Sequence, residues 1–117
     1  MAFSFTNENI ANVLLLKKQD NLTVEGVMEK RTIDKSSQFE RLNQNGISVL
    51  KDGNNQTMHQ KVFIIDEKTV ITGSMNPTGN GDKHNDENIL IIDDPLIAAM
   101  FMEEYGRVRG EAERIRD

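Results

Sequence analysis

The sequence predicts an α/β fold in which helices pack on both faces of a layered sheet. Segments with helical periodicity alternate along the chain with short runs rich in β-branched residues, the order typical of α/β layers. Residues 88–92 form a near-continuous apolar run, which is the pattern of a strand covered on both faces. The 117 residues are 37% hydrophobic and 28% charged, which suits a single domain with one modest core.

The first predicted helix and strand occupy the N-terminal third of the chain. Thr6 is expected to cap a helix in which Ile10, Val13 and Leu14 share one apolar face. The alternating residues 22–29 then predict a strand.

A second helix and strand follow. Ser36 is expected to cap a helix that buries Phe39 and Leu42 and ends at residues 45–46, an Asn-Gly pair. Residues 47–50 are predicted to form the next strand.

A hairpin, a loop and a long helix complete the expected fold. Two apolar runs, 62–65 and 69–72, flank a polar turn and predict a β-hairpin, and a loop is expected over 77–86. Asp94 and Pro95 are typical of a helix start. The apolar side of that last helix is expected to contain Ile97, Met100, Phe101 and Val108.

The hairpin region contains the most informative motif. It reads H-x-K, four residues, D, six residues, then G-S-x-N, and consists of His59, Lys61, Asp66, Gly73, Ser74 and Asn76. Because side chains alternate along a strand, the imidazole and the ammonium are expected to leave the same face. The hairpin then returns the chain to them, where the glycine permits close backbone approach and the hydroxyl and amide can bind phosphate oxygens. The motif therefore indicates phosphodiester chemistry.

This spacing resembles the signature of the phospholipase D superfamily, the HKD phosphodiesterases. The chemistry assigns His59 as a nucleophile that forms a covalent phosphohistidine, and Lys61, Ser74 and Asn76 as the groups that hold the phosphate oxygens. Asp66, at the turn, is given an orienting or structural role within the catalytic set. Glu87 is expected to hold the second ring nitrogen of His59.

For that orienting carboxylate, Asp86 is the competing candidate. His84, in the same polar segment, is interpreted as an exposed loop residue. A metal site made of His59, Asp66, His84 and Glu87 is the alternative by residue type, but the charge of Lys61 opposes a bound cation. We therefore expect neither a metal nor any other cofactor.

The resemblance also implies what this chain does not contain. Domains of this family usually have a further strand and helix before the position of Met1, so residues 1–117 are expected to be a fragment, the C-terminal part of a single-motif domain. The family builds one active site from two motifs, and this sequence has one. The second is expected from a homodimer or from another segment of a longer protein.

The nature of the substrate stays open between nucleic acid and phospholipid, with a slight preference for a nuclease-like activity. The net charge of −5 weighs against tight DNA binding, although Lys30, Arg31, Lys35 and Arg41 form a local basic group in the sequence. No run is apolar enough to span a bilayer and no signal peptide is recognised, so the default location is cytoplasmic. A non-catalytic folding or dimerisation module is the alternative function.

Overall fold

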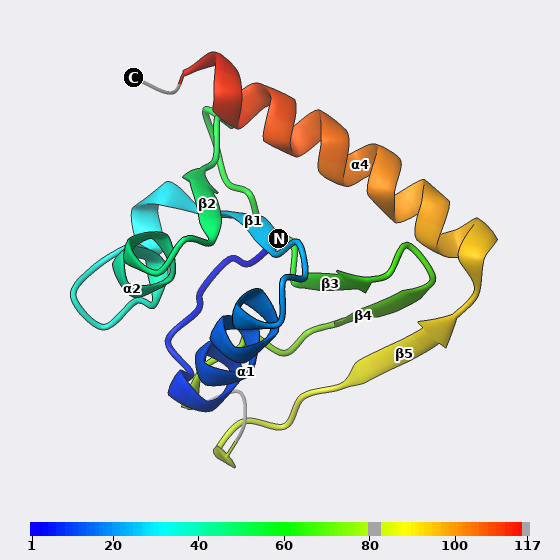
Figure 1. Cartoon of the computed structure of the whole chain (residues 1–117), viewed down its shortest axis with the longest axis horizontal. Coiled ribbons are helices and arrows are strands. Elements are labelled where there is room, and N and C mark those ends of the chain that lie inside the picture. Colours follow the sequence, from blue (N-terminus) through cyan, green and yellow to red (C-terminus); the bar gives the residue numbers. More distant parts are fainter. Residues whose placement is uncertain (80–82, 116–117) are drawn as a thin grey trace.

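Two β-ladders, which bridges of Ala2 join into one mixed sheet, form the centre of the fold (Figure 1). The computed structural model describes residues 1–79 and 83–115, and part of the predicted 77–86 loop therefore lies outside the described residues. One ladder is parallel and consists of β1 (Glu25–Met28) and β2 (Ser48–Lys51). The other is antiparallel, in the order β3 (Val62–Ile65), β4 (Thr69–Gly73) and β5 (Ile89–Asp93).

The backbone of residues 1–3 joins the two ladders. Ala2 makes a parallel bridge to Met28 on one side and an antiparallel bridge to Lys61 on the other. The amide of Phe3 donates to the carbonyl oxygen of Gln60 at 3.0 Å. The segment thus takes the place of a central strand between β1 and β3.

Helices cover both faces of this sheet, which confirms the predicted α/β class. They are α1 (Glu8–Gln19), the short 3₁₀ helix η1 (Lys30–Thr32), α2 (Phe39–Gln44) and α4 (Pro95–Arg114). Neighbouring residues of β1 point to opposite faces, as strand geometry requires. Val27 packs in one cluster with Val108 of α4, whereas Met28 packs in another cluster with Ala11 of α1.

The predicted helix start at Asp94 and Pro95 is confirmed, whereas the two predicted N-caps, Thr6 and Ser36, are wrong. Asp94 accepts hydrogen bonds from the amides of Leu96 and Ile97 at the start of α4. Asn7, not Thr6, caps α1, since its side chain accepts from the amide of Ile10. Ser36 bonds to Asp34 in a local turn.

The start of α2 therefore lies beyond Ser36. Its N-cap residue is Gln38, which makes no side-chain capping bond, and Ser37 accepts from the amide of Phe39. A run of short polar residues offers several equivalent acceptors, and tertiary packing selects among them.

The expectation that residues 88–92 form a strand covered on both faces is wrong. Strand β5 is at the edge of the sheet, and Leu90 and Ile91 are 61% and 67% exposed. Two predicted apolar faces also differ, because Val13 of α1 and Met100 of α4 are exposed. The buried positions of the described part of α4 are Ala98, Val108 and Ala112, since small side chains allow the helix to lie close to the sheet.

Candidate functional site

The antiparallel register brings three segments that are distant in sequence together at one end of strands β3, β4 and β5. Val62 pairs with Thr72, and Gly73 pairs with Ile89. The residues before β3, those after β4 and those before β5 must therefore lie together. These segments contain the His59 and Lys61 pair, the G-S-x-N element and Glu87, in that order.

His59 and Lys61 lie side by side although neither belongs to the regular strand, which begins at Val62. The Lys61 Nζ atom is 3.3 Å from Nδ1 and 3.4 Å from Nε2 of His59, and it donates to the His59 carbonyl oxygen at 3.0 Å. The ammonium therefore lies within hydrogen-bond distance of both ring nitrogens and can donate to whichever one carries no proton. His59 is exposed and open to a substrate. The predicted pairing of imidazole and ammonium is present in the structure.

Phe3 lies against both of these side chains. Its ring meets the His59 ring edge-on at 4.6 Å between centroids, and Lys61 Nζ lies 5.4 Å from its centroid. Aromatic edge contacts and cation–π contacts at such distances restrict the orientation of each partner. The sequence did not predict this role for Phe3, although the alternation of phenylalanine with small polar residues over 3–6 is typical of a short strand.

Glu87 influences Lys61 but does not contact His59. Burial lowers the pKa of Lys61, and the negative charge of Glu87 partly offsets that effect. Within residues 1–79 and 83–115, no hydrogen bond joins Glu87 or Asp86 to either ring nitrogen of His59. The orienting role predicted for Glu87 therefore stays a prediction.

Gly73 lets β4 and β5 approach closely at the site. It has a φ of +153°, and a Cβ there would lie 2.2 Å from the carbonyl oxygen of Asn88. Directly after it, the Ser74 amide donates to the Asn88 oxygen at 3.0 Å, and the Ser74 hydroxyl accepts from the Asn88 amide at 3.1 Å. The predicted reason for a glycine is confirmed, and the same contacts fix the Ser74 side chain.

Asn76 contains an unsatisfied polar atom. Its Oδ1 is buried and is the one buried side-chain nitrogen or oxygen in the described chain without a hydrogen-bond partner. The neighbouring Pro77 is held, because its carbonyl oxygen accepts from the amides of both Thr6 and Asn7 at the start of α1. An orphaned amide oxygen at a functional motif is typical of a group whose partner is a ligand or water.

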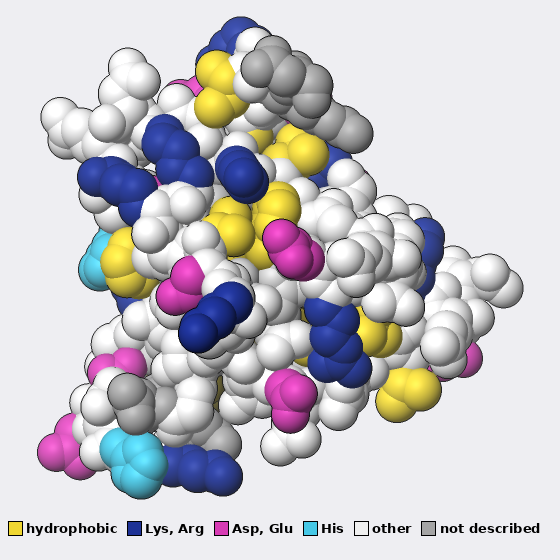
Figure 2. All heavy atoms as spheres, turned by 90° about the vertical axis from the view of Figure 1, so that its left-hand side faces the viewer, with side chains coloured by type: hydrophobic (Ala, Val, Ile, Leu, Met, Phe, Trp, Pro, Cys, Tyr) yellow, Lys and Arg dark blue, Asp and Glu magenta, His cyan; other side chains and the backbone are white. Residues whose placement is uncertain are grey.

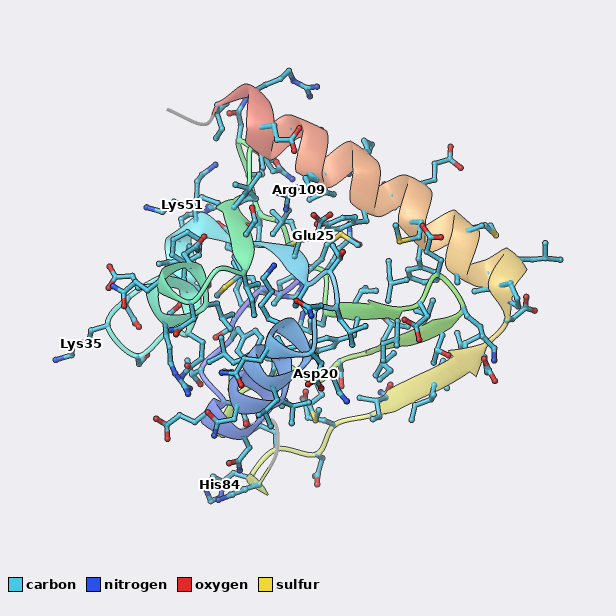
Figure 3. All side chains as sticks on the ribbon, in the orientation of Figure 1. Asp20, Glu25, Lys35, Lys51, His84 and Arg109 are labelled. Atoms are coloured by element: carbon cyan, nitrogen blue, oxygen red, sulfur yellow. The ribbon has the colours of Figure 1, made fainter. Side chains whose placement is uncertain are left out.

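Asp66 and His84 lie away from this arrangement. Asp66 is in the turn of the hairpin with a φ of 56°, at the opposite end of β3 from Lys61, roughly 16 Å away at the usual rise per residue. His84 points outward from the loop below α1 (Figure 3). Among the residues that the structure describes, no three His, Asp or Glu side chains come together, so the alternative four-residue metal site is not assembled.

The predicted basic group is largely engaged in internal contacts. Arg31 pairs with buried Glu29 at 2.9 Å, and Lys30 donates to the carbonyl oxygen of Asn54. Arg41 donates to Asn12 and Gln38. Lys35 extends into solvent, away from the other elements (Figure 3). On the face seen in Figure 2, Lys and Arg side chains are interspersed with acidic and hydrophobic ones.

Comparisons with known proteins identify a family for this chain. A family model described as a cardiolipin synthase, phospholipase D-like domain matches residues 1–109. The mitochondrial cardiolipin hydrolase of Xenopus laevis is 31% identical over 107 residues, which are 91% of this chain and 51% of that protein. The phospholipase D of Rickettsia prowazekii is 31% identical over 89% of this chain and 51% of its own length. The chain thus spans about half the length of these curated relatives.

Two solved structures are also similar. Nuc from Salmonella typhimurium, described as a phospholipase D family member, superposes with a TM-score of 0.88 at 30% identity, covering 95% of this chain and 76% of the other. NucT from Helicobacter pylori gives a TM-score of 0.88 at 25% identity, covering 94% of this chain and 76% of the other. In the described part of the chain, no helix is long and apolar enough to span a membrane.

Proposed function

Since its family match spans residues 1–109, the chain belongs to the phospholipase D superfamily, and we propose that it provides the nucleophile-bearing half of a phosphodiesterase. The observation that carries the proposal is the pairing of exposed His59 with Lys61, 3.3 Å apart, beside the Ser74 and Asn76 segment. An imidazole with an adjacent fixed cation and nearby hydrogen-bond donors is what phosphoryl transfer through a covalent intermediate requires.

In the first step, a lone pair on one ring nitrogen of His59 attacks phosphorus, and the bond from phosphorus to the leaving oxygen breaks. The leaving oxygen takes a proton from an acid on the opposite side of phosphorus. Charge that builds on the non-bridging oxygens is stabilised by the Lys61 ammonium. The amide nitrogen of Asn76 and the hydroxyl of Ser74 are the further donors that we assign to these oxygens.

In the second step, water attacks the phosphohistidine. The water loses a proton to the group that acted as the acid, the phosphorus to nitrogen bond breaks, and His59 is restored. The product is a phosphate monoester. Glu87 favours the reaction by holding the imidazole or by keeping Lys61 charged, and its effect on the pKa of Lys61 supports the second of these roles.

The acid must come from outside this copy of the motif, because one imidazole cannot lie on both sides of phosphorus. The chain contains two histidines, and the second, His84, points outward from the loop below α1 (Figure 3). We therefore assign the acid to His59 of a second chain across a twofold axis, or to a second motif in another segment of a longer protein.

The substrate that we propose is a phosphodiester whose scissile bond belongs to an extended nucleic-acid strand or to a phospholipid in a membrane. The site is at the ends of the antiparallel strands, where His59 and Ser74 are exposed. The named relatives include hydrolases of cardiolipin, a phospholipid. Nucleic acid and phospholipid are therefore the two substrates to be compared. The slight preference for a nuclease-like activity stays a prediction.

Hydrolysis of bis(p-nitrophenyl) phosphate by gel-filtration fractions of the chain tests the proposal. We expect activity to coincide with a dimer and to disappear in His59→Asn. The competing function, a non-catalytic folding or dimerisation module, predicts a folded chain without turnover in any fraction.

A further inference from the structure

Glu29 is a fully buried acidic residue at the end of β1, with an exposed fraction of 0%. Its carboxylate accepts three hydrogen bonds. Oε2 accepts from the amide of Met58 at 2.6 Å, and Oε1 accepts from the amide and the Nε of Arg31 at 3.1 and 2.9 Å. Buried carboxylates are costly unless paired and bonded in this way.

The bond to Met58 lies directly before His59 in the chain. On the other side of His59, the carbonyl oxygen of Gln60 accepts from the amide of Phe3. The backbone is thus fixed immediately before and after the imidazole. The side chain of His59 is itself exposed and contacts Lys61 and Phe3. The position of the imidazole therefore depends on where the backbone of residues 58–60 is held as well as on these two side-chain contacts.

Arg31 extends the same anchoring by one residue. Its Nη2 donates to the Thr57 hydroxyl at 2.9 Å, so the Glu29 and Arg31 pair holds two consecutive residues before His59. A second buried carboxylate, Asp52, accepts from the amides of Lys30 and Asn54 at the start of this connection. The segment between β2 and β3 is thus tied to the end of β1 at its start and again directly before His59.

We propose that Glu29, acting with Arg31, is a positioning residue that places the His59 imidazole for in-line attack. The expected loss of kcat rests on the proposed function. The expected change in the orientation of the His59 ring does not depend on it. A misplacement of about 1 Å in an attacking group lowers a rate by about 100-fold. One buried carboxylate therefore controls a nucleophile that it does not contact.

The substitution Glu29→Gln tests this role with little change of volume. A carboxylate only accepts hydrogen bonds, whereas an amide has one accepting and one donating end. The donating end of the new side chain must therefore direct its N–H groups at the N–H donor of Met58 or at those of Arg31. Either the bond from Met58 or the two bonds from Arg31 are therefore lost, and the segment before His59 shifts.

The matched control is Val49→Ala on β2. Val49 is buried at 6% exposure in the cluster that contains Met28 and Leu42, whereas Met58 belongs to a different cluster. This control loses core packing without changing a hydrogen bond of residues 57–61. Both variants are compared at a temperature where unfolding curves show more than about 95% folded protein.

Two readouts are taken. In a His84→Gln background, His59 is the one imidazole of the 117-residue chain, and its ring signals in the NMR spectrum report its environment directly. With bis(p-nitrophenyl) phosphate, kcat and KM are measured separately. We expect Glu29→Gln to shift or broaden the His59 ring signals and to lower kcat by about 10-fold or more while KM changes by less than about 3-fold. Val49→Ala should leave the signals and kcat near those of the parent.

Unchanged His59 signals in folded Glu29→Gln overturn the proposal, as does an equal loss of kcat in Val49→Ala. If the parent shows no turnover, the proposed function fails and the NMR result alone decides the positioning role. If Glu29→Gln does not fold, exposed Thr57→Val replaces it, because it removes only the Arg31 contact. A smaller shift of the same signals is then expected, and no shift overturns the proposal.

Discussion

Replacement of Gly73 by alanine should destabilise the protein and displace the phosphate-binding segment. A Cβ at this position would lie 2.2 Å from the Asn88 carbonyl oxygen and 2.8 Å from the Ile89 Cα. Both contacts are with backbone, which cannot move aside as a flexible side chain would. Strands β4 and β5 must therefore separate where they now pair, between Gly73 and Ile89.

The expected loss follows from three contributions. Overpacking against fixed neighbours costs about 1–3 kcal/mol. The φ of +153° adds strain of about 1–3 kcal/mol for any residue with a side chain. The two hydrogen bonds between Ser74 and Asn88 are weakened, at about 1 kcal/mol each. Since the strands relax partly, we expect a net loss of about 3–5 kcal/mol in the free energy of unfolding.

Urea denaturation followed by circular dichroism measures this loss, and Gly26→Ala is the matched control. Gly26 also lies in a strand, but a Cβ there meets no atom within 4 Å. We expect a change below about 1 kcal/mol for this control. A loss below about 1 kcal/mol for Gly73→Ala, or equal losses for the two variants, would show that close approach of β4 and β5 does not require a glycine at position 73.

Three further predictions concern charge and catalysis. Lys61→Ala should raise the activation barrier by about 3 kcal/mol, seen as a lower kcat for the chromogenic diester, and an unchanged kcat would contradict the role of the ammonium. Activity should persist in EDTA, and loss that a divalent ion restores would contradict metal-independent chemistry. Burial alone would raise the pKa of Glu29, but hydrogen bonds from Arg31 and Met58 lower it overall from 4.5. The stability that ionised Glu29 contributes is therefore complete above that pH and declines as the pH falls through the lower pKa of the folded state. The difference in unfolding free energy between wild type and Glu29→Gln should therefore shrink in acid denaturation. A difference that grows below pH 4.5 would contradict the lowered pKa.

The hairpin and its motif could be predicted from the sequence because their signals are local. Apolar runs on either side of a polar turn predicted β3 and β4, and the backbone at Asp66 and Glu67 takes the positive φ that such a turn requires. The glycine at 73 was predicted to allow close approach, and the structure shows the neighbour that demands it.

Other features depend on contacts between distant residues and left no local pattern. The contact of Phe3 with His59 and the bond of Glu29 to Met58 join positions 56 and 29 residues apart in the sequence. The exposure of β5 could not be predicted, because an apolar run has the same composition at the edge and at the centre of a sheet. The helix starts differed by one or two residues because adjacent polar side chains compete as caps.

The most direct test of the central claim is to trap the covalent intermediate. Wild-type chain is mixed with a phosphodiester substrate, quenched within milliseconds at alkaline pH and digested, and the peptide containing His59 is analysed by mass spectrometry. We expect a phosphoryl adduct on His59 that is lost on acid treatment and absent in His59→Asn. An adduct on Ser74, or turnover by His59→Asn at the wild-type rate, would contradict it.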